Sequence, residues 1–127
     1  EEFRKDCSIN YAKALQRNLE RKGPLSVFQK IQQMSIPQAC VSNGDPEVVE
    51  ANLATLELLD KVVFTISGRD VSHGKPHPEP YLKAVELLNL EPADCMAVED
   101  SGVGVRSASA AGLVTIAWPD EKKADEN

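Results

Sequence analysis

The stretch from Val98 to Gly112, which reads VEDSGVGVRSASAAG, constrains the fold more than any other part of the chain. A short apolar run ends in two adjacent acids, Glu99 and Asp100, and a serine with two glycines then leads into a segment of small residues. This order predicts a short buried strand, a loop with both carboxylates, and a helix that stops at Gly112. In open α/β sheets ligands bind at the carboxyl ends of the strands, so the two acids are predicted to lie at a ligand-binding edge.

The adjacent carboxylates of Glu99 and Asp100 are a candidate Mg²⁺ site. Two neighbouring carboxylates repel one another and lose hydration when they are partly buried. A cation that neutralises them removes this cost, and oxygen ligands favour a hard ion such as Mg²⁺. A strand that ends in an exposed acidic turn is the simpler alternative, and these two residues alone leave both interpretations open.

Strand-like and helix-like segments alternate along the rest of the chain. This alternation is typical of βαβ units and predicts an α/β fold with a mainly parallel sheet. Right-handed crossovers would place the carboxyl end of every strand at one edge of that sheet. Apolar runs predict strands at 38–41, 62–66, 95–98 and 113–118, and helical spacing of apolar residues predicts helices at 3–21, 24–36, 46–60, around 81–88 and up to 112.

The segment Ser42-Asn43-Gly44 directly follows the first predicted strand. Asp45 is a favourable N-cap for the next helix, and Pro46 a favourable first residue. The serine hydroxyl, the following backbone N–H groups and the positive end of that helix would together form a cradle for phosphate. The same residue types are also typical of an ordinary turn at the start of a helix, which is the alternative.

Lys75 stands between Gly74 and Pro76 in a loop that is rich in proline. Glycine permits a close approach of the backbone, and proline stiffens the chain that follows, so the ammonium group can be held in one place. A fixed point charge suits a phosphoryl oxygen. An ordinary surface lysine is the alternative interpretation.

His73 and His77 are four residues apart, and on a helix this spacing would form a metal-binding pair. Gly74, Pro76 and Pro78 exclude a helix at this point. The sequence therefore argues against a zinc site here.

Ser42, Lys75 and the two acids all follow ends of predicted strands, so we expect them to converge at one edge of the sheet. A hydroxyl, an ammonium and a metal-binding carboxylate suit phosphoryl transfer, in which catalysis is mostly positioning and charge neutralisation. Neither an obvious nucleophile nor a third metal ligand accompanies them in the sequence.

Three motifs in this order resemble those of the haloacid dehalogenase-like superfamily, in particular its helical-cap branch of β-phosphoglucomutase-like enzymes and sugar-phosphate phosphatases. CVSNG is similar to the second motif of that family, GKPHPEPYLKA to the third and VEDSGVGVRSASAAG to the fourth. The resemblance extends from about Pro24 to Trp118. It implies a Rossmann-like, three-layer α/β/α core with a mainly parallel sheet.

The resemblance also implies a role for each candidate residue. The phosphoryl group would be bound by a hydroxyl and an ammonium, the neighbouring residues would shape the substrate pocket, and the acids would bind Mg²⁺. The residues concerned are Ser42 and Lys75 as catalytic and substrate-binding residues, Asn43 and Gly44 as substrate-binding residues, and Glu99 and Asp100 as metal ligands.

The family's first motif, DxDG, which carries the aspartate nucleophile, does not occur in this sequence. Residues 1–22 resemble the last helix of a helical cap and residues 23–127 a partial core, without the central first strand and most of the cap. The resemblance implies part of a Mg²⁺-dependent phosphatase that acts on a small phosphorylated metabolite, a sugar phosphate, through an aspartyl-phosphate intermediate. By itself this part is expected to be inactive. A β-phosphoglucomutase-type phosphomutase and a non-catalytic module that binds phosphate or a protein are the alternatives.

Charge, apolar runs and cysteine content limit the classes of partner and the compartment that this chain suits. Twenty acidic residues against 14 Lys and Arg give a net charge of −6, which argues against nucleic acid and anionic membranes. No apolar run approaches the ~18 residues of a membrane span. Cys7, Cys40 and Cys95 form no CxxC pair, and the last two lie in apolar runs, so we expect small buried hydrophobes in a reducing compartment, the cytoplasm. The oligomeric state is not predicted.

Overall fold

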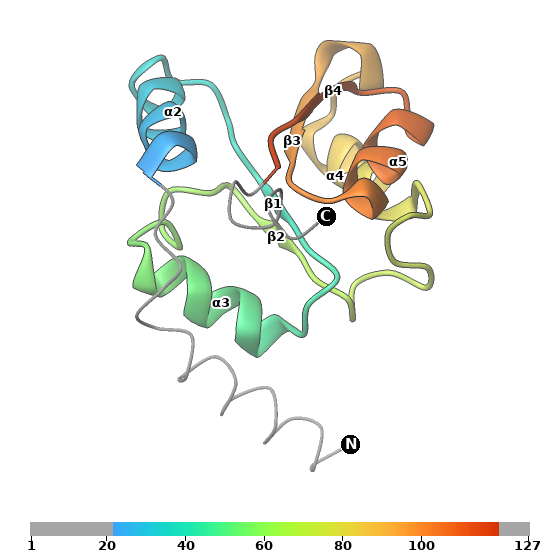
Figure 1. Cartoon of the computed structure of the whole chain (residues 1–127), viewed down its shortest axis with the longest axis horizontal. Coiled ribbons are helices and arrows are strands. Elements are labelled where there is room, and N and C mark those ends of the chain that lie inside the picture. The colour runs from blue at the N-terminus through green and yellow to red at the C-terminus, as the bar shows by residue number, and fades with distance from the viewer. Residues whose placement is uncertain (1–21, 120–127) are drawn as a thin grey trace. The chain divides into compact units, whose positions relative to one another are not determined.

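The computed structural model describes residues 22–119. Contacts within the chain divide it into two compact units, Glu1–Arg69 and Asp70–Asn127. Figure 1 labels the helices and strands of both. The predicted helix at 3–21 lies outside the described residues, and so does the predicted cap remnant at 1–22 except for Lys22. The division into a cap remnant and a core at 23–127 therefore stays a prediction.

The first unit contains a parallel pair of short strands in which Cys40 lies opposite Thr65. Further backbone bonds lengthen this pairing: the Val63 N–H donates to the Gln38 carbonyl at 2.8 Å, and the Ser42 N–H to the Ile66 carbonyl at 2.8 Å. The paired segments therefore match the predicted strands at 38–41 and 62–66. The elements of this unit are α2 (Lys22–Gln33), β1 (Cys40–Val41), α3 (Pro46–Thr55) and β2 (Thr65–Ile66).

The core of the first unit is built on the apolar face of α3. Val49 and Leu53 are buried at the predicted helical spacing, together with Leu58 from the turn that follows. The helix ends at Thr55, earlier than the predicted end near residue 60. Glu57 adopts a left-handed conformation (φ 58°), and the Leu58 N–H donates back to the Leu53 carbonyl at 2.8 Å. This Schellman motif closes the helix and turns Leu58 into the core.

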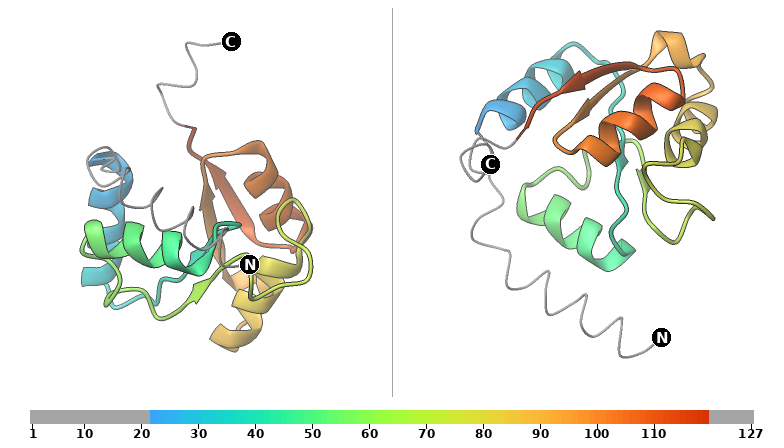
Figure 2. Two further views of the ribbon diagram at one scale, coloured as in Figure 1. Left: turned by 90° about the horizontal axis from the view of Figure 1, so that it is seen from below. Right: turned by 45° about the vertical axis from the view of Figure 1, so that its right-hand side comes forward.

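The second unit is a parallel two-stranded sheet covered by two helices. Met96 lies opposite Val114 and Glu99 opposite Ala117. Helix α5 packs against both strands, and α4 packs against α5 (Figure 2). The elements are α4 (Glu79–Leu88), a 3₁₀ turn η1 (Pro92–Asp94), β3 (Met96–Glu99), α5 (Gly102–Ala110) and β4 (Val114–Ala117).

Strand β3 is buried on only one face, which corrects the prediction of a buried strand. Ala97 and Glu99 are buried, whereas Met96 is 60% and Val98 47% exposed. Residues of both helices lie against Glu99, Tyr81 of α4 by a hydrogen bond and Gly104 of α5 by close approach, so α4 and α5 cover the same face. Alternate residues of a strand point to opposite sides, and the other side carries the exposed apolar side chains.

All hydrogen-bonded strands among residues 22–119 are parallel, which confirms the α/β class. Within this range the strands form two two-stranded sheets, one in each unit. Of the helices in the same range, none is long and apolar enough to cross a membrane.

The cysteines are less buried than predicted. Cys40 and Cys95 are only half-buried, and Cys7 lies outside the described residues. Burial raises the pKa of the Cys95 thiol, and the nearby Asp94 carboxylate raises it further. A raised pKa lowers the thiolate fraction at neutral pH, so Cys95 is a weak nucleophile and a poor candidate for a reactive site.

Candidate functional site

Lys75 and Glu99 form an ion pair that is almost closed to solvent. The Lys75 ammonium donates a hydrogen bond to Glu99 Oε1, and the two side chains are only 9% and 7% exposed. The buried Tyr81 hydroxyl donates to the same oxygen, and the Lys75 Nζ lies 5.3 Å from the centroid of the Tyr81 ring. This distance allows a cation–π interaction. Two residues singled out separately by the sequence thus form one cluster.

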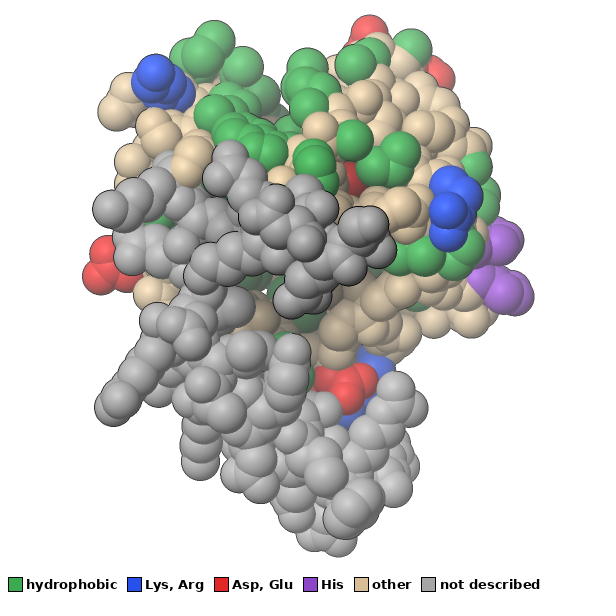
Figure 3. Space-filling model, in the orientation of Figure 1, with side chains coloured by type: hydrophobic (Ala, Val, Ile, Leu, Met, Phe, Trp, Pro, Cys, Tyr) green, Lys and Arg blue, Asp and Glu red, His purple; other side chains and the backbone are tan. Residues whose placement is uncertain are grey.

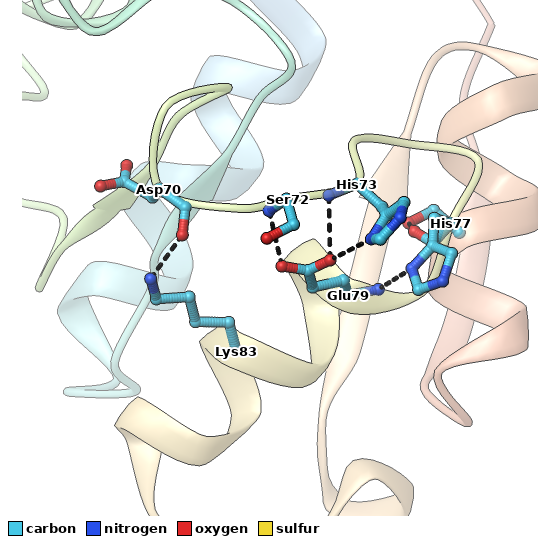
Figure 4. A network of polar contacts seen from close by, with 7 residues as sticks. Asp70, Ser72, His73, His77, Glu79 and Lys83 are labelled. Atoms are coloured by element: carbon cyan, nitrogen blue, oxygen red, sulfur yellow. Dashed lines mark hydrogen bonds and ion pairs between the residues drawn. The ribbon is translucent and has the colours of Figure 1, made fainter.

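The loop that carries Lys75 is fastened to the start of α4. Glu79 accepts the Ser72 N–H at 2.7 Å through Oε1 and the His73 N–H at 2.9 Å through Oε2 (Figure 4). In the segment between His73 and Glu79, the His77 N–H donates to the Gly74 carbonyl at 3.0 Å and closes a turn. The bond from the Ser72 N–H, with those from His73, holds the pKa of Glu79 below its ordinary value.

The other end of the same loop is tied to α5. Ser107 is fully buried, and its hydroxyl donates to the His77 carbonyl at 2.6 Å. A buried hydroxyl needs such a partner, because an unpaired polar group in the interior costs free energy. The loop is therefore held at both ends, and this fixes the position of Lys75 between them.

Gly104 makes room for the Glu99 carboxylate beside α5. A Cβ atom at this position would lie 2.0 Å from Glu99 Oε2, far inside van der Waals contact. The first turn of the helix is closed independently by Ser101, whose hydroxyl accepts the Gly104 N–H at 3.2 Å. The glycine is therefore required by the buried carboxylate rather than by the helix.

We expect Gly104→Ala to destabilise the chain by about 1 to 3 kcal/mol, the ordinary cost of overpacking, because the pinned Glu99 carboxylate cannot move aside without breaking its bond to Lys75. Gly102→Ala is the matched control in the same helix, since its Cβ would meet only Arg106 Nη1 at 3.5 Å. It should be neutral, or stabilising by roughly 0.4 to 1 kcal/mol. Urea unfolding of both variants tests this, and equal midpoints would contradict it.

The two predicted metal ligands occupy different environments. Asp100 follows β3 directly and is exposed, so its carboxylate fits a cation that keeps several water ligands, as Mg²⁺ does. Glu99 is buried, and its charge is balanced by Lys75. The cation expected to neutralise this acid is thus supplied by the chain itself. The assignment of both residues to Mg²⁺ stays a prediction.

The Ser42 loop belongs to the first unit, where it forms a tight turn before α3. Ser42 Oγ accepts the Gly44 N–H at 3.0 Å, and the Gly68 N–H donates to the Gly44 carbonyl at 2.9 Å. A Cβ at Gly68 would lie 2.6 Å from the Asn43 carbonyl oxygen, so only glycine permits this approach. Asp45 is the N-cap of α3, as predicted, although its side chain makes no capping hydrogen bond.

The predicted site residues are therefore divided between the units. Lys75 and Glu99 are in contact, and Asp100 follows in the chain. Ser42 and its two successors lie in the first unit, and their convergence with Lys75 stays a prediction. Sequence reasoning missed Tyr81, which lies in the helix predicted around residues 81–88. Its hydroxyl was the available signal, because a buried tyrosine O–H needs a partner.

Comparison with known proteins decides the family. The family model described as haloacid dehalogenase-like hydrolase matches residues 9–112. The chain belongs to the haloacid dehalogenase-like hydrolases. This confirms the resemblance of the three motifs, all of which lie within the matched range.

Similar members of the family include two named phosphatases. Validoxylamine A 7′-phosphate phosphatase of Streptomyces hygroscopicus subsp. limoneus is 35% identical over 94 residues, which are 74% of this chain and 44% of that protein. Hexitol phosphatase A of Escherichia coli is 37% identical over 95 residues, 75% of this chain and 44% of that protein. A solved structure described as a putative β-phosphoglucomutase from Thermotoga maritima superposes with a TM-score of 0.72 at 28% identity, covering 84% of this chain and 52% of its own. The chain thus spans about half the length of these relatives.

Proposed function

We propose that the protein to which this chain belongs is a Mg²⁺-dependent phosphoric monoester hydrolase that acts on a small phosphorylated metabolite, a sugar phosphate. The observation that carries this proposal is the buried cluster of Lys75, Glu99 and Tyr81, which holds one ammonium group in a fixed place. Membership of a hydrolase family and similarity to two named phosphatases support it.

In this proposal Lys75 contacts the phosphoryl oxygens and neutralises the charge on them as the phosphoryl group is transferred. Glu99 and Tyr81 are positioning residues: they fix the ammonium through one shared oxygen and so lower the cost of ordering it in the transition state. A lysine on a flexible stem would otherwise lose this side-chain entropy during catalysis.

Ser42, Asn43 and Gly44 form the proposed phosphate cradle in front of α3. Ser42 Oγ accepts the Gly44 N–H, so the oxygen is held while the hydroxyl proton can be donated to a phosphoryl oxygen. The turn precedes the N-terminus of a 10-residue helix, whose dipole favours an anion there.

Asp100 is the proposed Mg²⁺ ligand of this chain, because it is exposed at the end of β3 whereas the charge of Glu99 is balanced by Lys75. When bound, Mg²⁺ would neutralise phosphoryl oxygens. Glu99 contributes to the phosphoryl-binding site indirectly, because it positions the Lys75 ammonium. The aspartate nucleophile of the family's first motif is not among the residues of this chain.

A phosphomutase of the β-phosphoglucomutase type is the second candidate, and the structural similarity to the Thermotoga maritima protein favours it. The two activities differ in the final acceptor of the phosphoryl group, which is water for a phosphatase and a sugar hydroxyl for a mutase. A phosphatase therefore releases inorganic phosphate, whereas a mutase isomerises the sugar phosphate, and the products distinguish the two activities.

The test uses the full-length protein with a panel of sugar phosphates, with Mg²⁺ and with EDTA. We expect Mg²⁺-dependent release of inorganic phosphate. Sugar-phosphate isomers without net phosphate release would favour the mutase, and neither product with any substrate would favour a non-catalytic module.

The 127-residue chain alone is expected not to hydrolyse p-nitrophenyl phosphate in the presence of Mg²⁺, because it lacks the DxDG motif. Its rate should equal that of buffer. Turnover that depends on Mg²⁺ and disappears in Ser42→Ala would contradict this expectation and would require a nucleophile within these residues.

A further inference from the structure

His73, His77 and Glu79 form a cluster outside the Lys75–Glu99 site. The two imidazole rings are stacked with centroids 4.7 Å apart and planes inclined by 27°. Glu79 Oε2 lies 3.0 Å from His73 Nδ1, and one ligand atom from each of the three residues lies within 4.8 Å of the others. Figure 4 shows the three side chains gathered where the loop meets α4.

The sequence argued against a metal at the two histidines because glycine and prolines exclude a helix there. The structure contains no helix at this point, yet it brings the rings together by another route. The turn closed by the His77 N–H and the Gly74 carbonyl, at 3.0 Å, folds the loop back on itself. Helical spacing is therefore not needed for the pair to meet, and the argument against a metal does not hold for this loop.

Two imidazole nitrogens and one carboxylate oxygen are a ligand set for Zn²⁺ and other borderline divalent ions. Mg²⁺, by contrast, prefers oxygen ligands. Glu79 is ordered in advance, since the Ser72 and His73 N–H groups hold its carboxylate at 2.7 and 2.9 Å. Hydrogen bonds of this kind orient a ligand and strengthen binding.

The ligand atoms are accessible. The His73 side chain is 67% exposed and that of Glu79 31%, and His77 is also exposed. Figure 3 shows the two imidazoles beside one another at the surface. An ion can therefore reach the cluster from solvent without opening the buried pair of Lys75 and Glu99, whose side chains are at most 9% exposed.

The geometry requires small adjustments. An ion that replaced the proton between His73 Nδ1 and Glu79 Oε2 would have two ligands already 3.0 Å apart. Bonds of about 2.0 to 2.2 Å in a tetrahedral site place ligands roughly 3.4 Å apart, so these two atoms need little movement. The His77 ligand atom, within 4.8 Å of the others, must approach by ring rotation. Coordination through its Nδ1 would replace the 3.0 Å bond from the Glu79 N–H.

We propose that His73, His77 and Glu79 form a surface site for Zn²⁺ or another borderline divalent cation. The bound ion would connect His73 and His77, which flank Lys75 in the loop, to Glu79, the first residue of α4. It would therefore restrict the segment that presents the ammonium, without contacting the ammonium itself.

Calorimetric titration of the 127-residue chain with Zn²⁺ tests the proposal. We expect one ion per chain with a micromolar dissociation constant, weaker than a preformed structural zinc site because the ligands must close. Mg²⁺ at the same concentrations should give no binding at this cluster. His73→Gln and His77→Gln should each weaken Zn²⁺ binding roughly 10- to 100-fold, and Glu79→Gln by about 10-fold.

Glu86→Gln is the matched control, since it removes an exposed carboxylate from the same helix and should leave the affinity unchanged. Titration with Co²⁺ separates this site from the cysteines, because thiolate ligands give an intense charge-transfer band and nitrogen and oxygen ligands do not. A thiolate band, affinity equal in His77→Gln and the parent chain, or no Zn²⁺ binding in the micromolar range would each overturn the proposal. Circular dichroism of the variants should match that of the parent, since both rings are exposed.

Discussion

Replacement of Glu99 with alanine is expected to lower the free energy of unfolding by about 3 to 5 kcal/mol, because it leaves the Lys75 ammonium buried without its counter-charge. The ion pair itself need not be strongly stabilising, since desolvation of both charges offsets much of their attraction. Loss of one partner is different, because the desolvation cost of the other remains. The buried Tyr81 hydroxyl also loses its acceptor.

The chain offers a direct probe for this measurement. Trp118 is its single tryptophan. The backbone N–H of Trp118 donates to the Glu99 carbonyl at 2.7 Å, so the fluorescence of this residue reports on the ends of β3 and β4. Urea unfolding should be followed at this residue for Glu99→Ala and for Glu86→Ala, an exposed carboxylate on α4 that should change stability by less than about 0.5 kcal/mol. Equal midpoints for the two variants would show that the pair is not buried in solution.

The helix ends illustrate what the sequence could and could not predict. Within the described residues each of the four helices α2–α5 is followed within two residues by a left-handed residue, and the N–H of the next residue donates back into the last turn. Only Gly112 carries the usual signal, since glycine adopts positive φ without strain. The end of α5 was therefore predictable, whereas the end of α3 was placed too late. The left-handed residues are Ser35, Glu57, Asn89 and Gly112.

In the candidate site, too, some features were predictable from the sequence and others were not. Residue type and position after a predicted strand were enough to select Lys75 and Glu99, because ligands bind at the carboxyl ends of strands in open α/β sheets. Their pairing was not predictable, since it depends on which face of β3 is buried and on Gly104 leaving space beside it. The two-residue alternation of a strand puts Glu99 inside and Asp100 outside, so the adjacent acids were expected to act together but have separate environments.

In the full-length protein, Lys75→Met is expected to lower kcat about 100-fold, or roughly 3 kcal/mol, with a smaller change in KM. The ammonium is proposed to act on charge that develops as the phosphoryl group moves, so its loss affects the transition state more than the bound substrate. The variant is measured with the sugar phosphate that gives the highest rate, at saturating Mg²⁺.

Lys75→Met also leaves Glu99 buried without a counter-charge, and the resulting instability could imitate a catalytic defect. The double variant Lys75→Met/Glu99→Gln separates the two effects, because it removes both charges and keeps an amide oxygen that can accept the Tyr81 hydroxyl. We expect it to recover most of the lost stability while kcat stays about 100-fold below that of the parent protein. If the double variant recovered both stability and kcat, Lys75 would serve the fold alone. Recovery of stability without recovery of kcat would show that the Lys75–Glu99 pair is needed for phosphoryl transfer itself.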